Sequence, residues 1–245
     1  MTVIPVGFQI GVCWTYSTFH AAPWPHSALR LRTMNSRSTN HRIKTVYLLI
    51  LLCTLFASCS RLKQWAYQGG DRDQWQRPDK VIEALQIRQG AEIADLGAGA
   101  GYFTFHLAKA TGPSGKVYAV DVDKDTNELI AEKAQKDGVD NVVTILAKAN
   151  DPLLPKSGVD LIFTSNTYHH LDSRIVYFSN LRQYLKPGGR VAIIDFDRRA
   201  WLEGLLRHYT PSEFIKREME QAGYVLQLEP IFLDRQSFLV FAAKP

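Results

Sequence analysis

The stretch Ala91-Glu-Ile-Ala-Asp-Leu-Gly-Ala-Gly-Ala-Gly-Tyr102 determines the expected fold. An apolar strand runs into three glycines at alternate positions, and the pattern behind them, with Phe103 and Leu107 on one face, is typical of an amphipathic helix. A strand, a glycine loop and a helix in this order bring backbone N–H groups close to a ligand, because glycine adopts positive φ and has no Cβ. The stretch therefore predicts a site for a nucleotide-like cofactor.

The spacing of Gly97, Gly99 and Gly101 distinguishes between cofactors. A dinucleotide-binding fold has the pattern G-x-G-x-x-G, which would place its third glycine at Tyr102. The spacing here is G-x-G-x-G, with Asp95 two residues before the first glycine. This arrangement resembles motif I of the class I S-adenosylmethionine-dependent methyltransferases.

Three further segments resemble motifs of the same family, in the family's order. They are Lys116–Asp121, a second strand that ends in an acid, Asp160–Leu171, a fourth strand with its loop, and Leu185–Asp195, a turn and fifth strand. The resemblance covers roughly residues 71–245 and implies an α/β fold. It is a Rossmann-like, seven-stranded, mostly parallel sheet with an antiparallel C-terminal strand and helices on both faces. The implied cofactor is S-adenosylmethionine.

Strand and helix patterns alternate along this part of the chain. Strands are expected near residues 91–96, 116–121, 142–147, 159–165 and 189–196, and helices near residues 101–111, 125–137, 172–186 and 211–222. Such alternation predicts βαβ units and a parallel sheet. The last two strands begin at Gly223 and Gln236, and their connection is too short for a helical crossover, so this pair should be antiparallel.

The resemblance assigns roles to the glycine loop and to the acids around it. In the family, the acid at the position of Asp95 faces the amino group of the cofactor, and Gly97, Gly99 and Gly101 cradle its methionine end. Asp121 is expected to accept hydrogen bonds from both ribose hydroxyls, a role that suits a carboxylate.

Two further cofactor contacts are expected after the third and fourth strands. The family often has Gly-Asp-Ala after the third strand, with its acid on the adenine amino group, whereas this chain reads Ala147-Lys-Ala-Asn-Asp-Pro152. Asn150 is expected to bind the adenine edge through its amide, and Asp151 is the alternative. Asn166 is expected to contact the methionine portion of the cofactor.

His169 and His170 follow the fourth strand, beyond the carboxyl end where open α/β sheets bind ligands. Either histidine is a candidate general base toward the acceptor, and the alternative is that both are structural. No metal is expected, because adjacent side chains on a helix or strand diverge and no third ligand lies at zinc spacing.

The net charge of +5 comes from the N-terminal part of the chain. Residues 1–58 contain no acidic side chain, whereas the chain from Cys59 onward has 24 basic and 24 acidic residues. A neutral domain is not typical of a nucleic-acid-binding surface, so no nucleic-acid partner is expected. The cysteines, at positions 13, 53 and 59, all precede the domain, which excludes a disulfide or a thiolate nucleophile within it.

The N-terminal part resembles a bacterial secretory signal. A basic segment, 34–44, precedes an apolar run, 46–57, that is shorter than the ~18–20 residues a membrane-spanning helix needs. Phe56-Ala-Ser-Cys59 resembles a lipobox, which implies acylation of Cys59 and a lipid-anchored protein on the periplasmic face of the cell envelope. The alternatives are a cytoplasmic protein or one associated with the inner membrane.

The chain is therefore expected to have four parts. They are an extension, 1–33, that precedes the expected start of translation at Met34, a signal peptide, 34–58, a linker, 59–78, and a methyltransferase domain, 79–245. N-terminal sequencing of the precursor tests the first of these assignments.

Methyl transfer to an unidentified small or medium-sized acceptor is the expected function. One alternative is an envelope-anchored cofactor-binding protein with degenerate or no methyl transfer, which the altered adenine motif and the export signal favour. A less favoured alternative is an NAD-dependent oxidoreductase, which the glycine spacing argues against.

Overall fold

The computed structural model describes residues 72–200 and 209–244. The chain divides into two units, Met1–Leu52 and Cys53–Pro245, and the described residues belong to the second. The predicted extension, the predicted signal peptide and the linker up to residue 71 lie outside the described residues. Among the residues described, no helix combines the length and the apolar character needed to cross a membrane.

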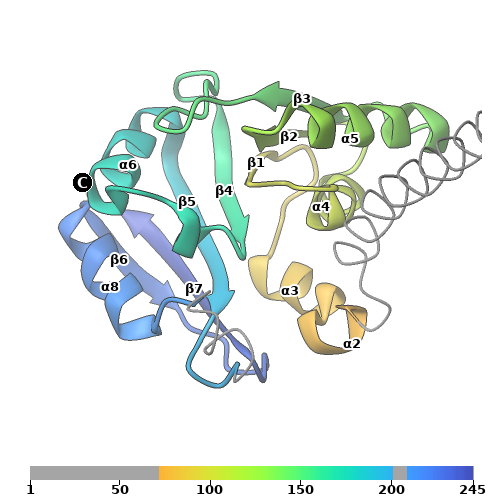
Figure 1. The fold of residues 1–245 in the computed structure, drawn as a ribbon. Coiled ribbons are helices and arrows are strands. Elements are labelled where there is room, and N and C mark those ends of the chain that lie inside the picture. Colours follow the sequence, from red (N-terminus) through yellow and green to blue (C-terminus); the bar gives the residue numbers. More distant parts are fainter. Residues whose placement is uncertain (1–71, 201–208, 245) are drawn as a thin grey trace, which may run out of the picture. The chain divides into compact units, whose positions relative to one another are not determined.

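A seven-stranded sheet forms the centre of the domain (Figure 1). In chain order its strands are β1 (Glu92–Leu96), β2 (Lys116–Asp121), β3 (Val142–Leu146), β4 (Val159–Ser165), β5 (Leu185–Phe196), β6 (Tyr224–Leu228) and β7 (Gln236–Ala243). Their order across the sheet is β3-β2-β1-β4-β5-β7-β6. Strands β1 to β5 pair in parallel, and β7 is antiparallel to both β5 and β6. The predicted fold class, including the antiparallel C-terminal pair, is confirmed.

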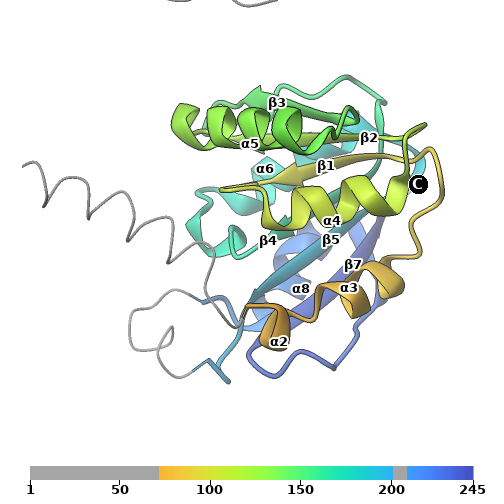
Figure 2. The same ribbon diagram turned by 90° about the vertical axis from the view of Figure 1, so that its right-hand side faces the viewer.

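Helices cover both faces of the sheet. They are α2 (Arg72–Gln76), α3 (Pro78–Leu85), α4 (Tyr102–Thr111), α5 (Lys124–Asp137), α6 (Arg174–Leu181) and α8 (Ser212–Gln221), with short 3-10 turns η1 (Tyr168–His170) and η2 (Arg182–Tyr184). Figure 2 shows α3 and α4 in front of the sheet and α6 and α8 behind it. Because successive strand residues point to opposite faces, Ile93 packs into the core beneath α3 and α4, and Ala94 into the core beneath α6 and α8.

Strand β5 begins four residues earlier than its predicted start at residue 189. The run Lys186-Pro-Gly-Gly189, expected as a turn before the strand, lies within it. The pairing of β5 with β4 shifts register between Val159 and Leu161. The run Lys186-Pro-Gly-Gly189 on β5 therefore forms an irregular bulge. The preceding helix is correspondingly shorter than predicted, because α6 ends at Leu181 and η2 follows.

The residues just before α3 are part of the folded unit. Residues 72–78, expected at the end of the linker, form α2 and the first residue of α3. Gln76 is fully buried, and its Nε2 donates to Ser165 Oγ at 3.2 Å and to Gln236 Oε1 at 3.4 Å. The described fold therefore extends N-terminal to residue 79, and α2 packs at the carboxyl ends of the parallel strands.

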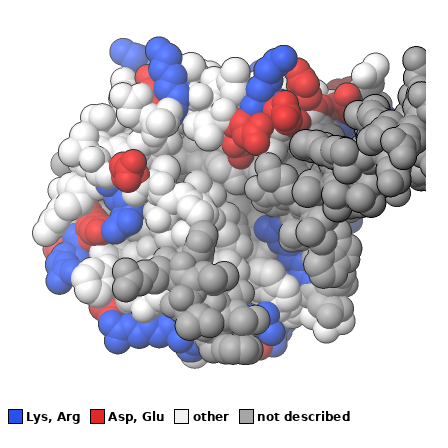
Figure 3. Space-filling model, in the orientation of Figure 1, with Lys and Arg blue, Asp and Glu red and all other residues white. Residues whose placement is uncertain are grey.

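Charged side chains of both signs are interspersed over the face shown in Figure 3. One group of them fixes the loop after β4. Arg174 Nε lies 2.8 Å from Glu218 Oε2, and the Tyr168 hydroxyl donates to the same oxygen at 2.6 Å. This network joins η1, α6 and α8, and thereby holds the histidine-bearing turn η1 at the end of β4.

Candidate functional site

The glycine loop lies where the strand order reverses direction. Strand β1 lies between β2 and β4, and in open α/β sheets ligands bind beyond the carboxyl ends of strands at such a point. The loop after β1 contacts the loop after β4, because the Thr167 hydroxyl donates to Gly97 O at 3.4 Å. Residues that follow β1, β2 and β4 therefore meet at one edge of the sheet.

Gly97 has no space for a side chain. Its φ is 69°, and a Cβ added there would lie 2.2 Å from Thr167 Oγ1. Gly99 and Gly101 also have positive φ, at 53° and 80°. The loop therefore keeps its backbone bare, which allows close approach. Its N–H groups donate within the protein, those of Gly97 and Ala98 to Val120 O and that of Gly99 to Asp121 Oδ2, so they are not directed at a ligand as the sequence predicts.

Asp121 lies at the end of β2 and is joined to the glycine loop. Its Oδ2 accepts from Gly99 N at 2.8 Å, and its Oδ1 accepts from Asp123 N at 3.0 Å. Each carboxylate oxygen has a second lone pair, so both can still accept from hydroxyl groups of a ligand. This geometry suits the diol-binding role predicted for Asp121.

Asp95, at the end of β1, is a buried acid with 2% exposure. The Thr104 hydroxyl donates to its Oδ2 at 2.6 Å. Burial raises the pKa of Asp95 to about 6, while the Thr104 hydrogen bond and the positive charge of Arg72 act in the opposite direction. A cationic group of a ligand would stabilise the charged form of this carboxylate.

Asn166 follows β4 with φ 57°, a conformation that asparagine tolerates better than most residues. Its Oδ1 accepts from Gln236 Nε2 at 2.5 Å, and its backbone N–H donates to Ile194 O at 2.8 Å. Because Gln236 is buried and also bonds Gln76, α2 and β7 together fix the orientation of the Asn166 amide.

The two candidates for adenine binding have different surroundings. Asn150 is exposed, in a turn closed by the backbone bond from Lys148 N to Asp151 O at 2.9 Å. Asp151 Oδ1 accepts from the Tyr184 hydroxyl at 2.7 Å and from Leu153 N at 2.9 Å. These hydrogen bonds lower the pKa of Asp151 and occupy it within the loop. Of the two, Asn150 is the one whose side chain is exposed.

His169 forms a buried pair with Asp195 at the end of β5. Its Nδ1 lies 2.7 Å from Asp195 Oδ1, and the two side chains are 6% and 0% exposed. Burial raises the pKa of Asp195, and the hydrogen bond with His169 opposes this rise. A neutral imidazole that donates from Nδ1 carries its lone pair on Nε2. In the sequence, Asp195 is marked only by its position as an acid at the end of a predicted strand.

The expectation that the two histidine side chains diverge is wrong. The ring centroids of His169 and His170 are 4.0 Å apart within the 3-10 turn η1. His170 is exposed, whereas His169 is not. Within residues 72–200 and 209–244, no group of three or more His, Cys, Asp or Glu is placed to hold a metal ion.

Helix α2 brings to the site residues that the sequence predicts to lie in the linker. The Tyr102 hydroxyl, one residue beyond Gly101, donates to Asp73 Oδ1 at 2.6 Å. The guanidinium carbon of Arg72 lies 3.9 Å from the centre of the Tyr102 ring. Five residues are too few to show helical periodicity, so only the structure identifies this contact with the glycine loop.

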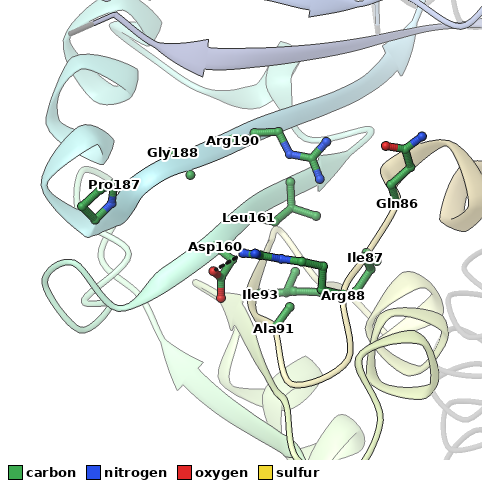
Figure 4. A pocket seen from close by; sticks show the side chains of 11 residues that line it. Gln86, Ile87, Arg88, Ala91, Ile93, Asp160, Leu161, Pro187, Gly188 and Arg190 are labelled. Carbon is green, nitrogen blue, oxygen red and sulfur yellow. Dashed lines mark hydrogen bonds and ion pairs between the residues drawn. The ribbon is translucent and has the colours of Figure 1, made fainter.

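A cleft of about 410 Å³ lies at the opposite edge of the sheet, beside the amino-terminal ends of β1, β4 and β5. Figure 4 shows Arg88 extending to Asp160 there, with Nη2 3.4 Å from Oδ1. Arg190 donates to Leu85 O at 2.6 Å. The guanidinium groups in this cleft therefore link the strand ends to the segment before β1, away from the glycine loop.

Known proteins resemble this chain over the same part of the sequence. The methyltransferase domain family matches residues 87–227. The ubiquinone/menaquinone biosynthesis C-methyltransferase UbiE of Pasteurella multocida is 28% identical over 119 residues, which cover 48% of this chain and 44% of that protein. The protein of the same name from Burkholderia multivorans is 26% identical over 118 residues, 48% of each chain. The chain spans about half the length of these curated relatives.

A solved structure extends the likeness to the whole fold. The SAM-dependent methyltransferase from Aquifex aeolicus superposes with a TM-score of 0.69 at 27% identity, covering 74% of this chain and 96% of that one. These matches, with the antiparallel β7, overturn the alternative of an NAD-dependent oxidoreductase, and the cofactor is S-adenosylmethionine. The family match covers more than half of the chain, which therefore belongs to the methyltransferase domain family.

Proposed function

We propose that this chain transfers the methyl group of S-adenosylmethionine to a small or medium-sized acceptor, with His169 as the general base. The observation that carries the proposal is the buried His169–Asp195 pair, next to the loop whose Thr167 contacts Gly97. A base so close to a cofactor loop is expected where an acceptor must lose a proton.

The residues at the glycine loop fit this cofactor. Asp95 would face its amino group, Asp121 its ribose hydroxyls, and the bare backbone of Gly97 would allow close approach. When bound, S-adenosylmethionine supplies a methyl group already activated by the sulfonium. The protein therefore needs mainly to position the acceptor and to accept its proton.

Asp195 acts through His169 in this scheme. Its buried carboxylate accepts the hydrogen bond from Nδ1, fixes the tautomer and stabilises the imidazolium that forms when Nε2 takes a proton. Relatives such as UbiE are named as carbon methyltransferases. An acceptor carbon or hydroxyl that releases a proton during methylation matches a base of this kind.

Replacement of His169 by glutamine is expected to lower the rate of methyl transfer about a hundredfold, because proton transfer to a positioned base contributes roughly 100-fold or more. The assay follows labelled methyl from S-adenosylmethionine into fractionated cytosolic and envelope metabolites. Binding of S-adenosylhomocysteine should be unchanged. A loss of rate in His170→Gln with none in His169→Gln would show that the base is assigned to the wrong histidine.

One observation favours the alternative of cofactor binding without methyl transfer. The adenine position offers the amide of an exposed Asn150, because the Asp151 carboxylate is bound to Tyr184. If the wild-type chain binds S-adenosylmethionine but labels no metabolite fraction, the alternative is favoured. Labelling that disappears in His169→Gln would exclude it.

The affinity for S-adenosylmethionine is expected to depend on pH through Asp95. Burial raises the pKa of this carboxyl to about 6 in the free protein, and its charged form is needed to pair with the cofactor's amino group. Kd should therefore be flat above about pH 7 and should rise toward tenfold per unit as the pH falls below about 6. Calorimetry across this range measures the profile. Asp95→Asn should bind weakly at every pH, and a flat wild-type profile would contradict the role of Asp95.

A further inference from the structure

Three residues in register cross the sheet at the edge opposite the glycine loop. Ile93 on β1 pairs with Leu161 on β4, and Leu161 pairs with Arg190 on β5. Side chains in register on neighbouring strands lie on the same face of a sheet. Ile93 and Leu161 are buried in the core beneath α3 and α4, whereas Arg190 is half-buried. A charged residue therefore stands next to an apolar pair, and all three residues line the cleft.

Most of the hydrogen-bonding capacity of Arg190 is unused. Its Nη2 donates to Leu85 O, the last carbonyl of α3, at 2.6 Å. A guanidinium group has five N–H donors, so this bond uses one of them. Arg190 forms no other hydrogen bond and no ion pair with the residues that the structure describes. Figure 4 shows its guanidinium group beside Leu161, at the cleft, where the remaining donors can meet a ligand.

The charged groups of the cleft leave one positive charge without a counter-ion. The charged residues in its lining are two arginines, Arg88 and Arg190, and one acid, Asp160. Arg88 Nη2 lies 3.4 Å from Asp160 Oδ1, and Lys186 Nζ lies 3.0 Å from Asp160 Oδ2. The only carboxylate in the lining is thus shared by two other cations. A bound monoanion would neutralise the charge that remains on Arg190.

The rest of the lining is largely apolar and suits the body of such an anion. Its apolar side chains are those of Ile87, Ala91, Ile93, Leu161 and Pro187. The cleft has a volume of about 410 Å³, within the range of roughly 300–1,000 Å³ that is usual for small-molecule sites. Apolar walls with a few convergent polar groups are the usual composition of such sites.

We propose that this cleft is a second ligand site, for a small monocarboxylate with an apolar body. The guanidinium fork of Arg190 would bind the carboxylate oxygens, and the apolar body would lie against Leu161 and Ile93. A carboxylate suits the cleft better than a phosphate dianion, because only one positive charge lacks a counter-ion and the planar fork matches a carboxylate. The site lies away from the glycine loop, so the inference does not depend on the proposed methyl transfer.

Benzoate and benzamide are matched probes for this cleft, because the two have nearly the same shape and only benzoate is charged. Equilibrium dialysis of the full chain with labelled benzoate should show one saturable site with a Kd on the order of 1 mM. Benzamide should bind at least about tenfold more weakly. Inorganic phosphate should bind more weakly than benzoate, and saturating S-adenosylhomocysteine should not displace benzoate.

Three variants locate the bound benzoate. Arg190→Gln should weaken it roughly 10–100-fold, because the charge-assisted bonds of the fork are lost. Arg88→Gln should weaken it only about twofold, because the Arg88 side chain is 83% exposed and its charge acts through solvent. Arg182→Gln is the matched control and should bind like wild type, because Arg182 Nη2 also donates to a backbone carbonyl, Lys244 O, at 2.7 Å but Arg182 does not line the cleft.

Circular dichroism shows whether each variant is folded. If Arg190→Gln does not fold, Arg190→Lys replaces it. This variant keeps the charge but loses the fork, and it should weaken benzoate at least about threefold.

Several results would overturn the inference. They are no saturable benzoate binding below about 10 mM, equal affinity for benzamide, wild-type affinity in the folded Arg190 variant, and displacement of benzoate by S-adenosylhomocysteine. Tighter binding of inorganic phosphate would overturn the assignment to a carboxylate. If the wild-type chain binds benzoate but not S-adenosylhomocysteine, the proposed function fails while this inference stands.

Discussion

Substitution of Asp121 by alanine is expected to weaken S-adenosylmethionine binding about a thousandfold. The substitution would remove two charge-assisted hydrogen bonds between the Asp121 carboxylate and the ribose hydroxyls, each contributing roughly 1.5–3 kcal/mol. The substitution also removes the acceptor for Gly99 N and Asp123 N, which connects the loop to the end of β2. Calorimetry with S-adenosylhomocysteine measures the loss of affinity, and the labelled-methyl assay should show no transfer.

Two further variants test whether the affinity lost in Asp121→Ala comes from the missing contact with the ligand or from a disordered loop. Asp121→Asn keeps one acceptor oxygen and should lose less affinity than the alanine variant. Asp125→Ala removes an exposed carboxylate from the first turn of α5, four residues away, and should bind like wild type. Wild-type affinity in Asp121→Ala would contradict the proposed cofactor site.

Replacement of Gly97 by alanine is expected to destabilise the domain by roughly 2–5 kcal/mol and to abolish cofactor binding. The added Cβ would lie 2.2 Å from Oγ1 and 2.4 Å from Cγ2 of Thr167, far inside contact distance. Such overpacking costs typically 1–3 kcal/mol, and the positive φ of 69° adds roughly 1–2 kcal/mol for a residue with a Cβ. Denaturant unfolding followed by circular dichroism measures the change.

The chain contains a matched control for the steric part of this cost. Gly138, at the end of α5, has φ 66°, and a Cβ there would meet nothing within 4 Å. Gly138→Ala should therefore cost only the roughly 1–2 kcal/mol of the positive φ. Thr167→Ala removes the two nearest atoms, so the double variant should recover part of the stability lost in Gly97→Ala. Equal losses in the two glycine variants would show that Thr167 does not limit the space at Gly97.

The sheet was predictable because its strands carry their own signal. Buried parallel strands are apolar along their length, and β1, β2 and β4 begin and end within one residue of the predicted positions. The short connection before Gln236 also predicted the antiparallel pairing of β6 and β7. Lys186-Pro-Gly-Gly189 was misread, because proline and glycine have the same local signature in a turn as in a strand bulge.

The sequence predicts a residue of the candidate site only where a short continuous motif contains that residue. Asp95, the glycines and Asp121 are marked by their positions at strand ends. The His169–Asp195 pair joins residues 26 positions apart, and the turn that aligns them has no sequence pattern. Arg72 and Gln76 reach the site only through tertiary packing of a five-residue helix, which local periodicity cannot reveal.

Calorimetric titration of the full chain with S-adenosylhomocysteine, with NAD⁺ as the comparison ligand, tests the central claim most directly. The buried acid, the bare glycine loop and the acid at the end of β2 predict saturable binding of S-adenosylhomocysteine that Asp121→Ala abolishes, and no binding of NAD⁺. Binding of NAD⁺ alone, or S-adenosylhomocysteine binding that survives in Asp121→Ala, would contradict the account.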